Sequence, residues 1–174
     1  SKRLVFRHVL PHRWLFGVTL RLASWLQRIL PRGEGRFRHL PQFLSALGAG
    51  RAIPEIAPQF LRSSIPERTP ATGTPKHRVG FFAGCATEYV FPEIGEMIVE
   101  VLRNLDCEVV FDRRQGCCGA PVCLSGDFRT GRKMATKNVE TFEDYDYVVT
   151  GCATCGSGLR EYPTYLAETA EERT

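Results

Sequence analysis

The chain has 174 residues and a net charge of +4, with 43% hydrophobic and 24% charged residues. This composition is typical of a soluble globular protein, and the length suits one domain with an appendage rather than two full domains. No apolar run approaches the roughly 20 residues that would cross a bilayer, and the first residues lack the apolar core of a signal peptide. We therefore expect a cytoplasmic segment of a longer polypeptide.

Residues 1–47 are predicted to be a basic amphipathic helical segment. Residues 1–40 contain nine Lys and Arg against one acidic residue, a net charge of +8 that leaves −4 on the other 134 residues. A helix is expected over residues 13–30, between Pro11 and Pro31. Apolar residues recur along it at steps of three and four and so share one face: Leu15, Val18, Leu22, Trp25 and Ile29.

This helix has two interpretations. Apolar stripes usually pack in a core, and Gly17 and Thr19 weaken the helix, so packing on a neighbouring domain or subunit is favoured. The alternative is peripheral contact with an anionic membrane, because Arg13, Arg21 and Arg28 flank the apolar face. No nucleic-acid partner is expected, since the basic helix lacks interleaved aromatic side chains of the stacking kind.

Residues 48–76 are predicted to form a linker. They contain five prolines, several glycines and the pair Ser63 and Ser64. Proline and glycine disfavour regular secondary structure, so we expect little of it here, in a linker that either drapes over another part of the protein or hangs free.

Residues 77–174 are predicted to be an α/β domain. Three strands are expected, at residues 77–84, 107–112 and 145–151, and a helix after each, at residues 92–105, 127–143 and 156–168. Strands that alternate with helices make right-handed crossovers and a parallel sheet. The expected fold is therefore a small parallel sheet with flanking helices, a Rossmann-like βαβαβα arrangement.

Cysteines follow each predicted strand. Five of the seven do so, and glycines flank them: Cys85, Cys117, Cys118, Cys152 and Cys155. The carboxyl ends of parallel strands meet at one edge of a sheet, where ligands usually bind, so we expect these thiols to share one metal site. Cys107 lies within a strand and is interpreted as a packing residue. Cys123 is either a spare thiol near the site or a packing residue, and is left unassigned.

The number of cysteine thiols indicates which kind of metal centre they would bind. Adjacent cysteines seldom bond to each other, because the closed ring strains the disulfide. Five thiolates exceed the four ligands of a structural zinc site, whereas iron–sulfur centres are held mainly by thiolates. An iron–sulfur cluster is therefore favoured, and zinc remains the alternative because the Cys-X-X-Cys motif also serves zinc.

The cysteine pattern resembles that of a known family. Cys85 precedes the triplet Cys117-Cys118-Gly119 by 31 intervening residues, and 32 more lead to Cys152-X-X-Cys155. This spacing is similar to the cysteine-rich CCG domain of heterodisulfide reductase and of the glycolate oxidase iron–sulfur subunit. The resemblance covers about residues 77–168, with a second gap about one residue shorter than in the family. Relatives commonly carry two CCG repeats and many carry ferredoxin motifs, so one repeat without such motifs fits a fragment.

The resemblance implies an electron-transfer role in an oxidoreductase. The same five cysteines would hold a 4Fe-4S cluster, which is noncubane in heterodisulfide reductase. The implied partners are a flavin-containing dehydrogenase subunit and other iron–sulfur domains, with a quinone, a disulfide or another acceptor. The alternative from the residues is a zinc-binding interaction module.

Overall fold

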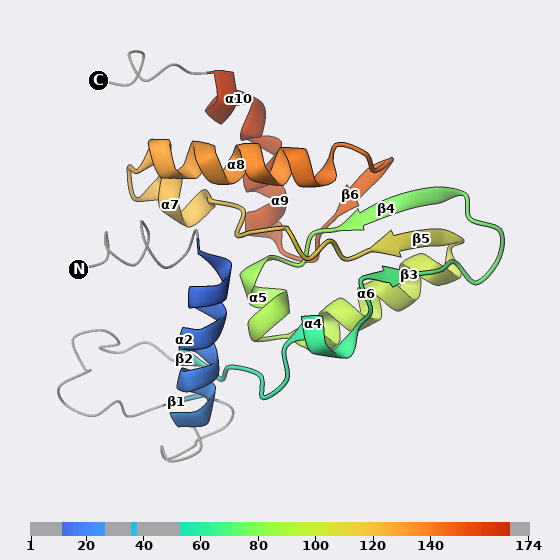
Figure 1. The fold of residues 1–174 in the computed structure, drawn as a ribbon, viewed down its shortest axis with the longest axis horizontal. Helices are drawn as coiled ribbons and strands as arrows, with labels where there is room; N and C mark the ends of the chain where they lie inside the picture. Colours follow the sequence, from blue (N-terminus) through green and yellow to red (C-terminus); the bar gives the residue numbers. More distant parts are fainter. Residues whose placement is uncertain (1–11, 27–35, 38–52, 168–174) are drawn as a thin grey trace.

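The computed structural model describes residues 12–26, 36–37 and 53–167. Its main feature is a four-stranded sheet of order β3-β5-β4-β6 (Figure 1). The strands are β3 (Arg68–Thr69), β4 (His77–Phe81), β5 (Cys107–Val110) and β6 (Tyr147–Val149). Both β5 and β6 run parallel to β4, whereas β3 is antiparallel to β5. The predicted α/β class and the parallel run of the three strands are confirmed, and β3 is an addition.

Residues 79–82, at the end of β4, alternate between two cores. Val79 and Phe81 pack with Leu61 of the preceding segment on one face of the sheet. Phe82, directly after the strand, belongs to the second core, on the other face. A Cβ added to Gly80 would lie 2.6 Å from the ring of Phe142, so this ring packs directly on the strand backbone. The period of two along a strand thus buries both faces of the sheet.

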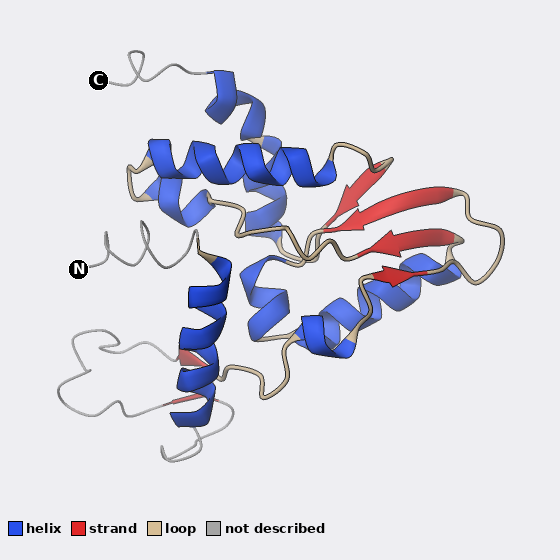
Figure 2. Cartoon of the chain, viewed as in Figure 1, coloured by secondary structure: helices blue, strands red, loops and turns tan. Residues whose placement is uncertain are grey.

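Helices cover both faces (Figure 2). One face carries α4 (Leu61–Ser64) and α6 (Pro92–Asn104), whose first residue is a proline, as the missing N–H permits. The other face carries α8 (Phe128–Phe142), which begins where Asp127 Oδ1 accepts a hydrogen bond from the Thr130 amide at 3.1 Å. The helices predicted at 92–105 and 127–143 are therefore present within a residue at each end.

The last predicted helix, 156–168, is not one continuous helix in the structure. It consists of two helices, α9 (Ala153–Arg160) and α10 (Tyr162–Ala167). Pro163 lies in the first turn of α10, a position that proline tolerates, whereas it would break a continuous helix. Within the predicted α/β domain, two short helices that the sequence did not predict are α5 (Gly84–Tyr89) and α7 (Ala120–Leu124). Each is too short to show a helical period.

Part of the predicted linker is packed. Residues 53–76 contain α4 and β3, together with β2 (Ile53–Pro54), which pairs with β1 (Arg36–Phe37). Leu61 is fully buried in the core beneath β4. The prediction of little regular structure is wrong for these short elements, because several buried apolar side chains, Leu61 and Ile65 among them, anchor the segment despite its prolines. Residues 48–52 lie outside the described residues.

The amino-terminal helix α2 (Arg13–Leu26) stands beside α5 (Figure 1). The ring of Phe16 contacts Tyr89 edge to face, with centroids 5.3 Å apart. The middle of the predicted apolar stripe, Val18, Leu22 and Trp25, is more than half exposed. The helix therefore packs on the domain through a face other than the predicted stripe; Arg28 and Ile29 lie outside the described residues. Among the described helices, none is both long and apolar enough to cross a membrane.

Candidate metal centre

The five predicted cysteines lie at the carboxyl ends of the three parallel strands. Cys85 is the second residue of α5, which follows β4. Cys117 and Cys118 lie in the loop between β5 and α7. Cys152 is the amino-terminal cap of α9, and Cys155 lies in the first turn of that helix. Three segments that are distant in sequence therefore bring these thiols to one edge of the sheet.

The thiols of these five residues, the thiol cluster, form one connected series of neighbours. Neighbouring thiols along this series are Cys85 and Cys117, Cys117 and Cys118, Cys118 and Cys155, and Cys155 and Cys152. All seven cysteines of the chain are free thiols. The thiol cluster thus contains every residue that the sequence selected.

The two remaining cysteines lie elsewhere. Cys107 Sγ is 3.8 Å from the carbonyl oxygen of Leu105, and its side chain belongs to the core on the opposite face from the thiol cluster. Cys123 is buried against Gly131 of α8. Both cysteines are packed in the interior, as expected for small apolar side chains.

Hydrogen bonds within the thiol cluster distribute its charge unevenly. Bonds from Cys117 and Cys155 lower the pKa of Cys118. The same bonds raise the pKa of the two donors, because each would lose a favourable contact on ionising. The bond from Cys117 also lowers the pKa of Cys85. Cys118 and Cys85 therefore ionise more readily than Cys117 and Cys155.

The surroundings of the thiol cluster are apolar and closely packed. Cys118 and Cys155 are buried with Phe82, Phe142 and Ala120. Gly84 adopts a φ of +68°, and a Cβ added to it would lie 2.7 Å from Cys155 Sγ. A glycine is needed here both for the left-handed backbone and for the close approach of the Cys155 sulfur.

A small cavity of about 20 Å³ reaches the thiol cluster. Cys85 and Cys117 line it, together with Glu88 of α5 and Phe16 of α2. Glu88 is buried and paired with Arg62. Burial raises the pKa of Glu88, although Arg62 opposes the shift. Helix α2 therefore contributes a side chain to the wall of this site.

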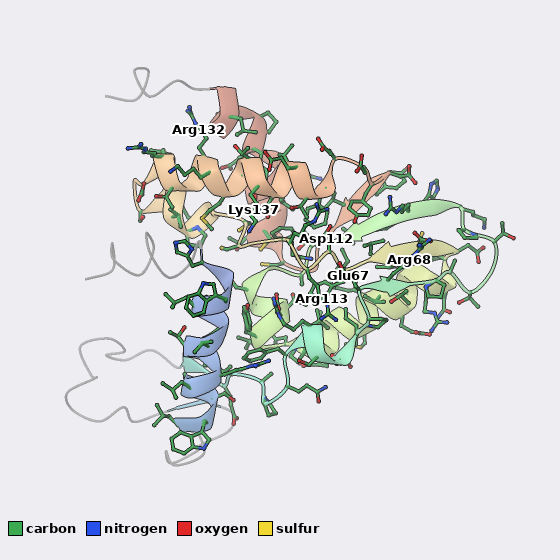
Figure 3. The ribbon with its side chains drawn as sticks, in the orientation of Figure 1. Glu67, Arg68, Asp112, Arg113, Arg132 and Lys137 are labelled. Atoms are coloured by element: carbon green, nitrogen blue, oxygen red, sulfur yellow. The ribbon has the colours of Figure 1, made fainter. Side chains whose placement is uncertain are left out.

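Three buried polar side chains that sequence analysis missed hold the cysteine loops. Gln115 is one: its Oε1 accepts a hydrogen bond from the Ala83 amide, and its Nε2 donates to the Phe81 and Asp112 carbonyls, each at 2.9 Å. This glutamine joins the end of β4 to the turn after β5, where Asp112 lies (Figure 3). The others are Asn138 and Tyr162. Because polar residues usually lie on the surface, the sequence holds one signal for these roles: Gln115 lies directly before the segment with the adjacent cysteines.

The donor set fits a sulfur-bound metal centre. Within residues 12–26, 36–37 and 53–167, no group of three or more His, Cys, Asp or Glu side chains is arranged around a single ion position. The thiols contact one another in pairs instead. Thiolates are the usual ligands of iron–sulfur clusters, and the five cysteines, four of which pack in one apolar cluster, match that donor chemistry.

Comparison with known proteins identifies the family of this segment. Residues 79–160 match the model of the CCG cysteine-rich domain. The "Probable glycolate oxidase iron-sulfur subunit" of Bacillus subtilis is 30% identical over 176 residues, which cover 98% of this chain and 39% of that protein. A subunit of the fumarate reductase (CoM/CoB) of Methanothermobacter marburgensis is 33% identical over 120 residues, covering 68% of this chain and 23% of that protein.

A shorter match is "Lactate utilization protein A" of an Exiguobacterium species, 39% identical over 87 residues, which cover 49% of this chain and 36% of that protein. The chain thus spans less than two fifths of the length of each of these relatives. No solved structure matches the chain. Two relatives are named as subunits, and the matched segment contains all five residues of the thiol cluster. Residues 79–160 of this chain therefore belong to the CCG cysteine-rich domain family.

Proposed function

We propose that this chain is an iron–sulfur electron-transfer component of an oxidoreductase. The observation that carries the proposal is the thiol cluster, in which cysteines from the ends of three strands lie at one edge of the sheet. The name of the B. subtilis relative, an iron-sulfur subunit, agrees with it. The proposed ligands are the five residues of the thiol cluster, and the proposed group is a 4Fe-4S cluster, cubane or noncubane.

The protein would supply the position and surroundings of this group. When bound, a 4Fe-4S cluster accepts and donates single electrons. The thiol cluster would provide its ligands from three separate loops, which fixes their relative positions through the sheet. Phe82 and Phe142 would keep water from the buried sulfurs. Such exclusion of solvent tunes the reduction potential of a metal centre.

The proposed partners are a flavin-containing dehydrogenase subunit and further iron–sulfur domains. Electrons would pass between the flavin partner and a quinone, a disulfide or another acceptor. The chain spans 39% of the B. subtilis relative, so the remaining components of the relay would belong to the longer protein. This segment alone would not complete a turnover.

The proposed division of the chain into segments follows that of the CCG family. Residues 77–174 would form the CCG domain with a Rossmann-like arrangement, 48–76 a connector whose residues 53–76 pack on that domain, and 1–47 a helical segment. Support comes from the alternation of helices with β4, β5 and β6 along the chain.

We also propose a cytoplasmic location with peripheral membrane contact through α2. Support comes from the exposed apolar residues Trp14, Val18, Leu22 and Trp25, and from the +8 charge of residues 1–40. The purified chain should sediment with vesicles that contain anionic lipid and stay free of vesicles of neutral lipid. If the chain sediments with neither kind of vesicle, membrane contact is contradicted, and the apolar stripe of α2 would instead bind a protein partner.

The central test is the metal content of the chain purified without oxygen. Iron and acid-labile sulfide in equal amounts, with a brown colour, are expected. Zinc leaves a protein colourless because its d shell is full. Colourless protein with one zinc ion per chain would overturn the proposal in favour of a zinc-binding module.

A further inference from the structure

Two buried side chains hold the backbone of the turn that carries the adjacent cysteines. Asn138 of α8 accepts a hydrogen bond from the Gly116 amide at 2.9 Å and donates to the Cys117 carbonyl oxygen at 3.0 Å. Its amide also donates to the hydroxyl of Tyr162 at 2.8 Å. That hydroxyl in turn donates to the Cys118 carbonyl oxygen at 2.9 Å. Three successive residues of the turn are therefore tied to one pair of side chains.

The pair is built into the interior. Asn138 is 1% exposed and Tyr162 is 5% exposed. Every bond joins two protein groups directly, and each polar atom of the two side chains has a partner. Buried polar groups are costly unless they are paired, so a fully bonded pair at this depth holds a defined geometry.

The turn would be loose without these bonds. Gly116 precedes the adjacent cysteines and Gly119 follows them with a φ of +81°. Glycine gives the backbone freedom that costs entropy to restrain. Anchoring the carbonyls of Cys117 and Cys118 restrains the peptide groups that orient their Cβ atoms. Each sulfur is then left with rotation about χ1 alone, and the two sulfurs meet different partners, Cys85 and Cys155.

We propose that Asn138 and Tyr162 are positioning residues that fix the directions of the Cys117 and Cys118 thiols. Tyr162 lies two residues beyond the segment that matches the CCG family, so this role extends the site into α10. The hold on the turn is a property of the metal-free chain. Its importance for metal binding rests on the function proposed above.

The first test measures amide hydrogen exchange in the metal-free, reduced chain. Tyr162→Phe removes one hydroxyl from the pair and keeps the ring. Amides of the 113–120 segment should exchange roughly tenfold faster, the factor for loss of one buried hydrogen bond, while amides of β4 keep their rates. Tyr145→Phe is the matched control, because that hydroxyl makes a long bond, 3.5 Å, to the Asp112 carboxylate rather than to the cysteine turn. Unchanged exchange in the 113–120 segment, or an equal rise in β4, would overturn the proposal.

A second variant guards against a failure of Tyr162→Phe to fold. Asn138→Asp keeps the oxygen that accepts from Gly116 and removes the donors to Cys117 and Tyr162. It should loosen the same segment. Rates in that segment equal to those of the unaltered chain would count against the proposal in the same way.

The second test follows the metal. After reconstitution with iron and sulfide, Tyr162→Phe should lose iron to a chelator roughly tenfold faster than Tyr145→Phe, and its paramagnetic resonance spectrum should differ from that of the unaltered chain. A purely structural role would leave that spectrum unchanged. Faster exchange in a chain that takes up no iron would retain the positioning role and remove the proposed function. Iron uptake with unchanged amide exchange would retain the proposed function and remove the positioning role.

Discussion

Gly84 and Cys155 approach so closely that a Cβ on the glycine would lie 2.7 Å from the cysteine sulfur. The glycine opens α5, after β4, and the cysteine lies in α9, after β6. Two of the three cysteine loops therefore touch through a backbone atom and a sulfur. A side chain at residue 84 would separate them.

Gly84→Ala should destabilise the protein more than Gly126→Ala. Both glycines have positive φ, +68° and +86°, so alanine costs about 1 to 2 kcal/mol of backbone strain at each. Nothing lies within 4 Å of a Cβ at residue 126, whereas the one at residue 84 meets Cys155. Overpacking should bring the loss in the free energy of unfolding to about 2 to 5 kcal/mol for Gly84→Ala. Equal losses in guanidinium unfolding would show that only backbone strain matters.

Gln115→Ala should cost about 3 kcal/mol of unfolding free energy. It removes three hydrogen bonds and leaves the buried Ala83 amide without its acceptor. Gln59→Ala is the control, because Gln59 is exposed and makes one long bond, 3.4 Å, to the Ser63 carbonyl. That change should stay within about 0.5 kcal/mol. Urea unfolding of both variants checks the difference, and similar losses would refute a joining role for Gln115.

Cys118→Ser and Cys107→Ser should separate ligand from packing roles. Both thiols are buried, with exposed fractions of 3% and 8%. The Cys118 variant should lose or alter the bound iron, since serine oxygen is a poorer ligand for iron–sulfur clusters than thiolate. The Cys107 variant should keep its iron and lose only stability. Iron and sulfide analysis after anaerobic purification decides, and equal metal loss in both would mean that the ligands are misassigned.

Asp112 should make the free energy of unfolding depend on pH in the acidic range. Burial alone would raise its pKa, but hydrogen bonds from Arg114 outweigh burial and hold the pKa below its ordinary value near 3.8. A depressed folded pKa means that the carboxylate stabilises the fold fully above that value and less as pH falls through the folded pKa. The stability difference between the unaltered chain and Asp112→Asn should therefore shrink from about pH 6 to about pH 2. Urea unfolding across this range would show a constant difference if Asp112 were uncoupled from folding.

Local patterns predicted the elements that carry the cysteines, and long-range contacts decided the rest. The alternation around Val79 and the helical period around Val99 reflect burial of one face, which a single segment records. The two-residue strand β3 depends on pairing with β5, which no local pattern encodes. The same holds for Asn138, whose partners lie 21 to 24 residues away.

The helix α2 illustrates the limit most clearly. Its periodicity revealed an apolar stripe but could not say which neighbour covers it. The helix contacts the domain through Phe16 instead, whose ring packs edge to face against the ring of Tyr89. A helix that is apolar around much of its surface leaves more than one face available for packing.

The contacts of the thiol cluster have a consequence for the order of biogenesis. Cys117 follows Cys85 by 32 residues and Cys155 follows Cys118 by 37, so each pair forms only after a long loop closes. A nascent chain with β4 and β5 but without α9 still lacks two of the five sulfurs. The proposed iron–sulfur cluster should therefore be inserted last, into a polypeptide whose sheet has already closed.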